Sequence, residues 1–401
     1  MWEQIRANKR NSLLLMFLMA VVLGLLGWMI GMSVSPAPYS GAFGLAVAMC
    51  IWMILAMVSL SSGDAIFLAA SKATPVTKDV HPQLFNVVEE MAIAAQLPMP
   101  KIYIINDPAP NAFATGRNPQ NASLAVTAGL LGRLNRDELQ GVVGHEMSHI
   151  LNRDILFITV AGIMLGAITL ISEVFLRGMF YSSLGGRRYS SRGRGRNDGG
   201  QAIIMIIAIL AAILAPLMAT LLYFAISRKR EYLADAGSAR LTRYPEGLAS
   251  ALEKISDNTI PLQSANKVTA PMYIVNPLQK AGMKLSDWSS THPPISQRVK
   301  ILRSMSGASF ADYSDAFKRT TKHSTVIPSS ALKQETVEIR QSSKQGPVSG
   351  KNIHRNIGDV MFKTAGFRFV QCDCGLKLKV PPDYSSNNVH CPRCGMIHQL
   401  S

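Results

Sequence analysis

Four long apolar runs constrain the fold of this 401-residue chain more than any other feature of its sequence. They are Leu13–Met32, Gly41–Leu60, Ile155–Ile171 and Ala202–Ile226. A helix needs about 20 apolar residues to cross a bilayer, and the first two runs meet this length without a charge. Hydrophobic residues make up 48% of the chain and charged residues only 16%, so we expect a mainly α-helical membrane protein with sizeable soluble parts. The alternative for each run is a buried core helix, which weighs most for the short third run.

Charged residues near these runs predict how the chain is oriented. Arg6, Lys9 and Arg10 precede the first run, and the loop at 33–40 has no Lys or Arg, so the N-terminus is expected in the cytoplasm. The first run is too long for a signal peptide and the second follows at once, which predicts an N-terminal transmembrane hairpin over residues 1–70. The soluble residues that follow are then cytoplasmic.

The net charge of +16 raises the question of a nucleic-acid partner. The basic residues are scattered rather than gathered on one helix, so a membrane surface is the better interpretation and no nucleic acid is expected. Five arginines between Arg187 and Arg196 lie in a Gly- and Ser-rich loop between the third and fourth runs. Basic charge favours the cytoplasmic side, whereas two full crossings would place this loop outside. The hairpin at about 155–226 is therefore either spanning or re-entrant.

A His-Glu-Met-Ser-His motif has the H-E-x-x-H spacing of zinc hydrolases. Residues i and i+4 share one helix face, so His145 and His149 can offer two imidazole nitrogens to one zinc ion. Glu146 then lies beside the open position, where it can take a proton from a zinc-bound water. Asn135 and Glu138 form a capping-box pattern at the start of this helix. The alternative is an accidental match on a solvated helix, which the mostly apolar surroundings disfavour.

A catalytic zinc site needs a third protein ligand. Glu231 and Asp235 follow the fourth run and are again i and i+4, so Glu231 can be that ligand and Asp235 can hydrogen-bond a ligand imidazole. On composition alone, a solvated helix of alternating charge explains the pair equally well. The hairpin favours the metal site, because the outer ends of its two runs emerge at the same membrane surface.

Four motifs in the same order resemble those of the HtpX-type membrane zinc metalloproteases, relatives of the CAAX-prenyl endopeptidases within the gluzincin group. The motifs are Pro110–Gly116, Gly144–Asp154, Ser227–Asp235 and Thr291–Arg298. The resemblance runs from the N-terminus to about Met305. It implies a gluzincin metalloprotease domain with a small β-sheet at 71–305, interrupted by the membrane hairpin.

The resemblance also implies roles for individual residues. It implies zinc on His145, His149 and Glu231, with Glu146 as the base, and a strand and turn at Asn111–Gly116 beside the cleft. Composition independently predicts two further strands, at Lys101–Asn106 and Ala122–Thr127. An edge strand there could pair with an extended peptide substrate, and a plain supporting sheet is the alternative.

His292 and Arg298 resemble the family's late His-Pro-x-x-x-Arg element. In the functional interpretation His292 stabilises the oxyanion, while Arg298 braces an acidic partner such as Asp235. The alternative is a Pro-rich turn that begins a helix and carries a surface histidine. The sequence weighs the two evenly.

The C-terminal part of the chain predicts a polar linker and a second metal site. Residues 306–355 are rich in Ser, Lys and Gln, which predicts a linker. Two close cysteine pairs follow: Cys372 with Cys374, and Cys391 with Cys394. They predict a zinc ribbon at 356–401 with a structural zinc ion, for which His390 and His398 could be substitute ligands. Two disulfides are the alternative, which a reducing cytoplasm disfavours.

These features predict a zinc metalloendopeptidase, multi-pass in the bacterial cytoplasmic (inner) membrane, with its active site and C-terminus facing the cytoplasm. The expected partners are the bilayer and protein or peptide substrates. The resemblance implies damaged or misassembled membrane proteins as substrates, in quality control and stress response. Two alternatives stay open: regulated cleavage of one specific membrane protein or peptide, and a catalytically silent metal-binding adaptor.

Overall fold

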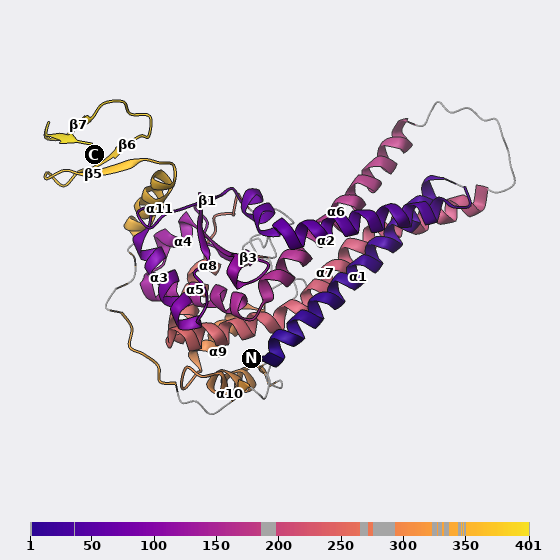
Figure 1. The fold of residues 1–401 in the computed structure, drawn as a ribbon, viewed down its shortest axis with the longest axis horizontal. Coiled ribbons are helices and arrows are strands. Elements are labelled where there is room, and N and C mark those ends of the chain that lie inside the picture. The colour runs from indigo at the N-terminus through magenta and orange to yellow at the C-terminus, as the bar shows by residue number, and fades with distance from the viewer. Residues whose placement is uncertain are drawn as a thin grey trace.

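The fold has a helical membrane part, a soluble body and a small C-terminal tail (Figure 1). The computed structural model describes residues 2–35, 37–185, 198–264, 272–275, 293–322, 327, 331–332, 337–343, 346, 348 and 350–400. The arginine-rich loop and His292, both singled out in the sequence, lie outside these residues. The predicted class, a mainly α membrane protein with a small β-sheet, is confirmed.

Four of the described helices are long and apolar enough to cross a membrane: α1 Trp2–Val34, α2 Ser40–Ala70, α6 Asp154–Gly185 and α7 Asp198–Thr242. Their candidate spans contain 23, 31, 28 and 20 residues, so the third run has enough length as well. All four helices extend to the same side of the soluble body (Figure 1). α1 and α2 cross so closely that a side chain at Gly44 would collide with the Gly27 carbonyl.

A four-stranded sheet in the order β1-β2-β4-β3 supports the soluble body. Its elements are β1 Ala73–Pro75, β2 Lys101–Ile105, β3 Ala112–Gly116, the 3-10 helix Pro119–Asn121 and β4 Ala122–Thr127. β2 and β4 are parallel, whereas β1 pairs with β2 and β3 with β4 in antiparallel fashion. The three strands predicted from the sequence are confirmed, and β3 forms one edge of the sheet.

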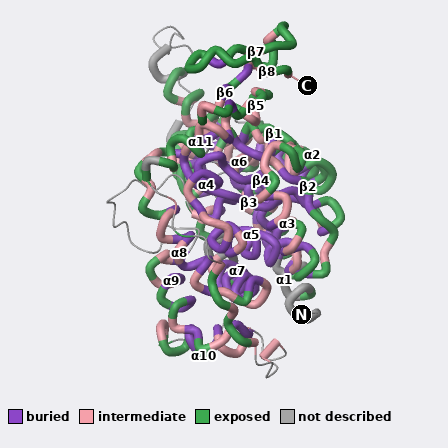
Figure 2. Tube along the Cα trace, turned by 90° about the vertical axis from the view of Figure 1, so that its left-hand side faces the viewer, coloured by how far each residue is buried: buried purple, intermediate pink, exposed green. Residues whose placement is uncertain are grey.

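Helices pack on this sheet and on one another. α4 Ala128–Arg133 contacts β4 and α5 Arg136–Leu151 contacts β3, while α3 Pro82–Ala95 and α8 Pro245–Ser256 pack against α5, and α9 Ile295–Arg303 packs against α8. Figure 2 shows α5 as a buried helix within the soluble body. The predicted capping box starts it: the Asn135 side chain accepts the Glu138 N–H at 3.0 Å, and the Asn135 N–H donates to the Glu138 carboxylate at 2.9 Å. The sequence therefore identified the first turn of this helix correctly.

The segment expected as a linker begins with ordered structure instead. Helix α10, Phe310–Thr321, starts at a capping box formed by Ser309 and Asp312. Tyr313 and Phe317 on this helix are buried in the core. The linker prediction rested on polar composition, which obscured these aromatic residues at helical spacing.

The tail begins with helix α11, Gly350–Thr364, which also starts inside the expected linker. α11 lies against α4, where Ile357 contacts Gly132. Two antiparallel hairpins follow: β5 Arg368–Gln371 with β6 Lys377–Val380, and β7 Asn388–His390 with β8 Ile397–Gln399. The tail is thus attached to the soluble body through α11, on the side away from the membrane helices (Figure 1).

Candidate active site and metal centres

Helix α5 presents its two motif histidines on a buried face. His145 and His149 are 1% and 4% exposed, and their Nε2 atoms lie 3.2 Å apart. α7 crosses α5 so closely that a side chain at Gly237 would collide with that of Ser148. This close crossing allows a residue of α7 to reach the histidine pair.

Glu231 of α7 is the residue that reaches it. Its carboxylate oxygens lie 3.7 Å from His145 Nε2 and 3.5 Å from His149 Nε2, and one ligand atom from each residue falls within 4.8 Å of the others. Nitrogen and oxygen ligands about 2.1 Å from a tetrahedral zinc ion stand about 3.4 Å apart. The three side chains therefore fit a zinc ion in donor type and spacing. Because Glu231 is buried, the solvated-helix interpretation is wrong.

Each histidine has a carboxylate on its other ring nitrogen. His145 Nδ1 lies 3.0 Å from Asp235 Oδ1, and His149 Nδ1 lies 3.3 Å from Asp154 Oδ2. Such partners fix the tautomer that leaves Nε2 available to a metal. Asp235 was expected near a ligand imidazole, whereas the role of Asp154 was missed. Its only sequence signal is its place at the end of the motif that contains the two histidines.

Arg298 of α9 lies against Asp235 inside the protein. Its Nε and Nη2 donate to the two carboxylate oxygens at 2.8 and 2.6 Å, and its Nη1 lies 3.6 Å from Glu231 Oε2. Burial acts to raise the pKa of Asp235, but the Arg298 charge and the contact with His145 outweigh it and lower that pKa. The structure thus places Arg298 against Asp235, the acidic partner that the sequence suggested.

Glu146 lies between the histidine pair and the sheet edge. It is 3% exposed, and this burial raises the pKa of its carboxyl group above the usual value. The Ala114 backbone in β3 acts in the opposite direction on this pKa, but burial outweighs it. A buried carboxyl group with a raised pKa is suited to take up a proton and pass it on.

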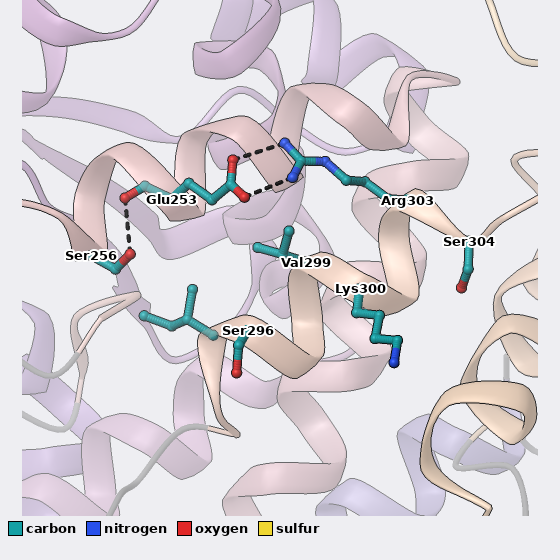
Figure 3. Close-up of a pocket in the computed structure, with 8 residues that line it drawn as sticks. Glu253, Ser256, Ser296, Val299, Lys300, Arg303 and Ser304 are labelled. Carbon is teal, nitrogen blue, oxygen red and sulfur yellow. Dashed lines mark hydrogen bonds and ion pairs between the residues drawn. The ribbon is translucent and has the colours of Figure 1, made fainter. Parts of the chain in front are cut away.

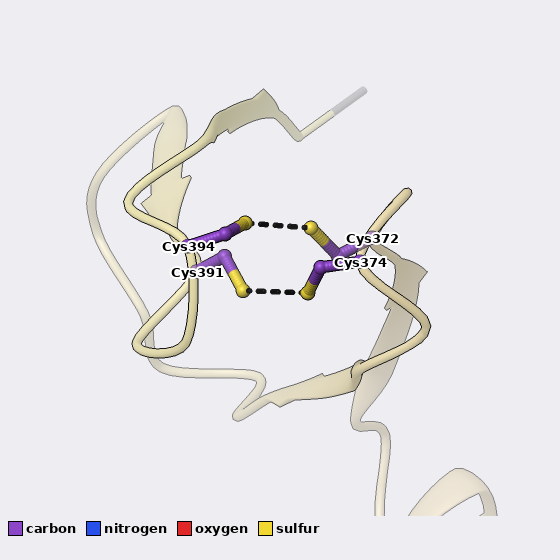
Figure 4. Close-up of side chains that lie close together, drawn as sticks. All are labelled: Cys372, Cys374, Cys391 and Cys394. Carbon is purple, nitrogen blue, oxygen red and sulfur yellow. Dashed lines mark hydrogen bonds between the residues drawn. The ribbon is translucent and has the colours of Figure 1, made fainter.

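The four tail cysteines come together from two segments of the tail (Figure 4). The Sγ atoms of Cys372 and Cys394 lie 3.4 Å apart, those of Cys374 and Cys391 lie 3.6 Å apart, and all four fall within 4.8 Å. A disulfide bond is about 2.05 Å long, so neither pair is bonded. Four thiolates about 2.3 Å from a zinc ion stand about 3.8 Å apart, which fits this cluster.

A surface pocket between α8 and α9 lies apart from both clusters (Figure 3). Arg303, which lines it, donates to Glu253 at 2.7 Å and to Glu246 at 2.8 Å. None of its lining residues belongs to the predicted sites. Its ion pairs join α8 to α9, and neither helix carries one of the three metal-site side chains.

Comparison with known proteins agrees with this geometry. Residues 79–306 match the model of peptidase family M48. The chain is 47% identical over 304 residues to a "Protease HtpX homolog" of Dictyoglomus thermophilum, covering 76% of this chain and 94% of that protein. It is 43% identical over 306 residues to the one from Streptococcus gordonii, covering 76% and 100%.

Among solved structures, S. mikatae Ste24p superposes with a TM-score of 0.40 at 19% identity, covering 75% of this chain and 67% of that one. That similarity is too weak to carry an argument. The family match covers more than half of the chain, and the four long apolar helices are those of a membrane protein. The chain therefore belongs to peptidase family M48 and is a membrane-bound zinc metalloprotease.

Proposed function

We propose that the protein cleaves misfolded or damaged membrane proteins at the cytoplasmic face of the bacterial inner membrane, in quality control and stress response. The observation that carries this proposal is the convergence of His145, His149 and Glu231 where α6 and α7 meet the soluble body. A hydrolytic site there lies close to chain segments that leave the bilayer. The protease relatives support cleavage of polypeptides as the reaction.

The chemistry follows from the groups at this site. His145, His149 and Glu231 would hold one zinc ion, which when bound polarises the scissile carbonyl and lowers the pKa of water. Glu146 takes the proton of the attacking water and donates it to the leaving amine. Because Glu146 is buried, competing solvent is excluded from its carboxyl group.

The outer edge of β3 supports an extended peptide as substrate, because this strand lies at the end of its sheet. β3 is the outer strand of its sheet, and alternate residues of the strand direct their backbone groups away from β4. Among them, the Ala112 carbonyl already accepts the Ile274 N–H at 3.0 Å, and the Ala112 N–H donates to the Asn111 side chain. A peptide would therefore pair further along the strand, beyond Ala112. A peptide added along this edge would bring its backbone next to Glu146. Such pairing requires an unfolded segment, which favours misfolded proteins over compact ones.

We expect replacement of Arg298 by Leu to lower kcat by about 10- to 100-fold. Asp235 would lose its buried counter-charge and would no longer hold His145 in place. The measurement is kcat on casein together with the zinc content of the purified protein. Arg303→Ala, on the same helix but 42% exposed at its side chain, is the matched control and should keep wild-type kcat. Wild-type kcat in Arg298→Leu would contradict the bracing role.

We also propose that the active site faces the cytoplasm. The basic residues before α1 favour a cytoplasmic N-terminus, and four crossings return the chain to that side. Cysteines introduced at Ser190 or Ser191 are then expected to react in spheroplasts with a membrane-impermeant maleimide. The unsubstituted chain gives the background from its own cysteines. Labelling that requires lysis would instead indicate a re-entrant hairpin.

The tail is proposed to hold a second, structural zinc ion on its four cysteines. Few of its apolar residues are buried, so the fold of the tail has little core of its own to stabilise it. A metal ion would supply the missing stabilisation.

The test of the proposed function is cleavage of casein, and of the chain itself, by detergent-purified protein loaded with zinc. The comparison is with Glu146→Gln carrying the same metal. If the wild type is as inert as the variant, the assignment of the active site fails.

A further inference from the structure

The segment at 337–343, which we call the strap, lies where α7 ends and α5 begins. It lies beyond the part of the chain that matches the M48 family, which ends at residue 306. The strap is joined to the soluble body at its first residue, where the Val337 carbonyl accepts the Ala308 N–H at 2.8 Å. Its polar composition gave no indication of these contacts in the sequence.

The strap binds the last turn of α7. The Arg340 N–H donates to the Arg243 carbonyl at 2.9 Å, and its Nε donates to the Thr242 carbonyl at 2.9 Å. In return, Arg243 Nε donates to the Glu338 carbonyl at 3.3 Å. The last carbonyls of a helix have no partner within the helix, so the strap supplies donors that the end of α7 lacks.

The same strap binds the first turns of α5. Arg340 Nη2 donates to Asp137 Oδ1 and to Gln140 Oε1, both at 2.7 Å. The Ser343 N–H and hydroxyl donate to Asp137 Oδ2 at 2.6 and 2.8 Å. The Asp137 side chain is only 6% exposed, so both of its oxygens are satisfied largely by the strap. A charge-assisted hydrogen bond of this kind is stronger than a neutral one, and here a single nitrogen, Arg340 Nη2, contacts both α5 side chains.

One guanidinium therefore joins the helix of His145 and His149 to the helix of Glu231. We propose that Arg340 is a positioning residue, which together with Ser343 holds α5 and α7 at the spacing that the zinc ligands require. This inference rests on the proposed ligand set. Arg340 touches none of the reacting groups and acts only through the two helices. It makes the C-terminal extension part of the protease rather than an appended module.

The experiment compares full-length Arg340→Ala with wild type, and uses Arg319→Ala as the matched control. Arg319 is exposed and donates to the Ser304 carbonyl at 2.7 Å, so its contact joins α10 to the end of α9 and leaves α5 and α7 untouched. For Arg340→Ala we expect kcat on casein to fall about 10-fold with little change in KM. Zinc release from the active site to a chromophoric chelator should be faster by a similar factor. Arg319→Ala should match wild type in both measurements.

A double-mutant cycle separates positioning from a general loss of stability. If Arg340 acts through Asp137, Asp137→Asn should slow catalysis by itself and add little in the Arg340→Ala background. Arg340→Lys, which keeps the charge without the planar fork, should recover only part of kcat. Ser343→Ala is the milder variant if Arg340→Ala does not fold, with zinc release expected to be about 2- to 3-fold faster.

Two results would overturn the inference while leaving the proposed function intact. One is wild-type kcat and zinc release in Arg340→Ala, or in Ser343→Ala where only that variant folds. The other is full additivity of the Arg340 and Asp137 substitutions. A wild-type enzyme that is inactive with zinc bound would instead refute the proposed function, and with it the basis of the inference.

Discussion

Replacement of Glu146 by Gln is expected to lower kcat on casein by about 10²- to 10⁴-fold while the active-site zinc stays bound. Gln has nearly the same shape as Glu and keeps a carbonyl oxygen in the same place, so the local structure should persist. It cannot take up a proton, and this is the one property that the proposed reaction requires of residue 146. KM should change little, because the proposed pairing of substrate with β3 does not depend on that proton.

The measurement needs detergent-purified protein of known zinc content, assayed on casein and for self-cleavage. Glu138→Gln is the matched control. Glu138 is buried in the same helix, but its carboxylate meets Ser250 at 2.6 Å and Lys254 at 2.7 Å instead of the metal site. It should keep wild-type kcat at temperatures where it is folded. Comparable activity in Glu146→Gln and wild type would remove Glu146 from the reaction.

Removing either metal cluster should lower the zinc content by one ion, but only loss of the cluster at Glu231 should abolish proteolysis. Wild-type protein should bind two zinc ions per chain, one for each cluster. Glu231→Ala should bind one and lose proteolysis, because two histidines alone bind zinc far more weakly than a complete set of ligands. The double variant Cys391→Ser/Cys394→Ser should also bind one, yet keep proteolysis within a few-fold of wild type.

The reason for this contrast is the position of each cluster. Glu231 lies inside the soluble body, 3.7 Å from His145, whereas the cysteines lie in the tail beyond α11. Zinc content by mass spectrometry of the native protein, with casein cleavage on the same samples, checks the prediction. If the cysteine variant still binds two zinc ions per chain, the tail cluster is not a zinc site.

Much of the fold was predictable because its signals are local. The apolar runs, the strands at Lys101–Asn106 and Ala122–Thr127 and the capping box at Asn135 each depend on neighbours in the sequence. The convergence of His145, His149 and Glu231 was anticipated because the membrane hairpin forces its two ends together. The topology of the hairpin, rather than the spacing of residues in the sequence, therefore indicated that Glu231 lies near the two histidines.

The parts that escaped prediction depend on contacts between distant segments. Asp154 looks like any acidic residue in the first turn of a helix, and only the fold places it against His149. α10 did carry a local signal, since Phe310, Tyr313 and Phe317 share one face, but the surrounding Ser and Lys residues obscured it. The strap has no local pattern at all, because its partners are Asp137 and the far end of α7.

α7 has one consequence for when the protein can be active. It is a single helix of 45 residues that contains the fourth apolar run and, further along, Glu231. The element that anchors the protein and the element that completes the proposed metal site are therefore the same. On the ligand set proposed here, a newly made chain whose hairpin has not yet entered the bilayer lacks the third ligand beside its histidines. Insertion of the hairpin and assembly of the proposed ligand set are therefore coupled, because both require α7 to take its place beside α5.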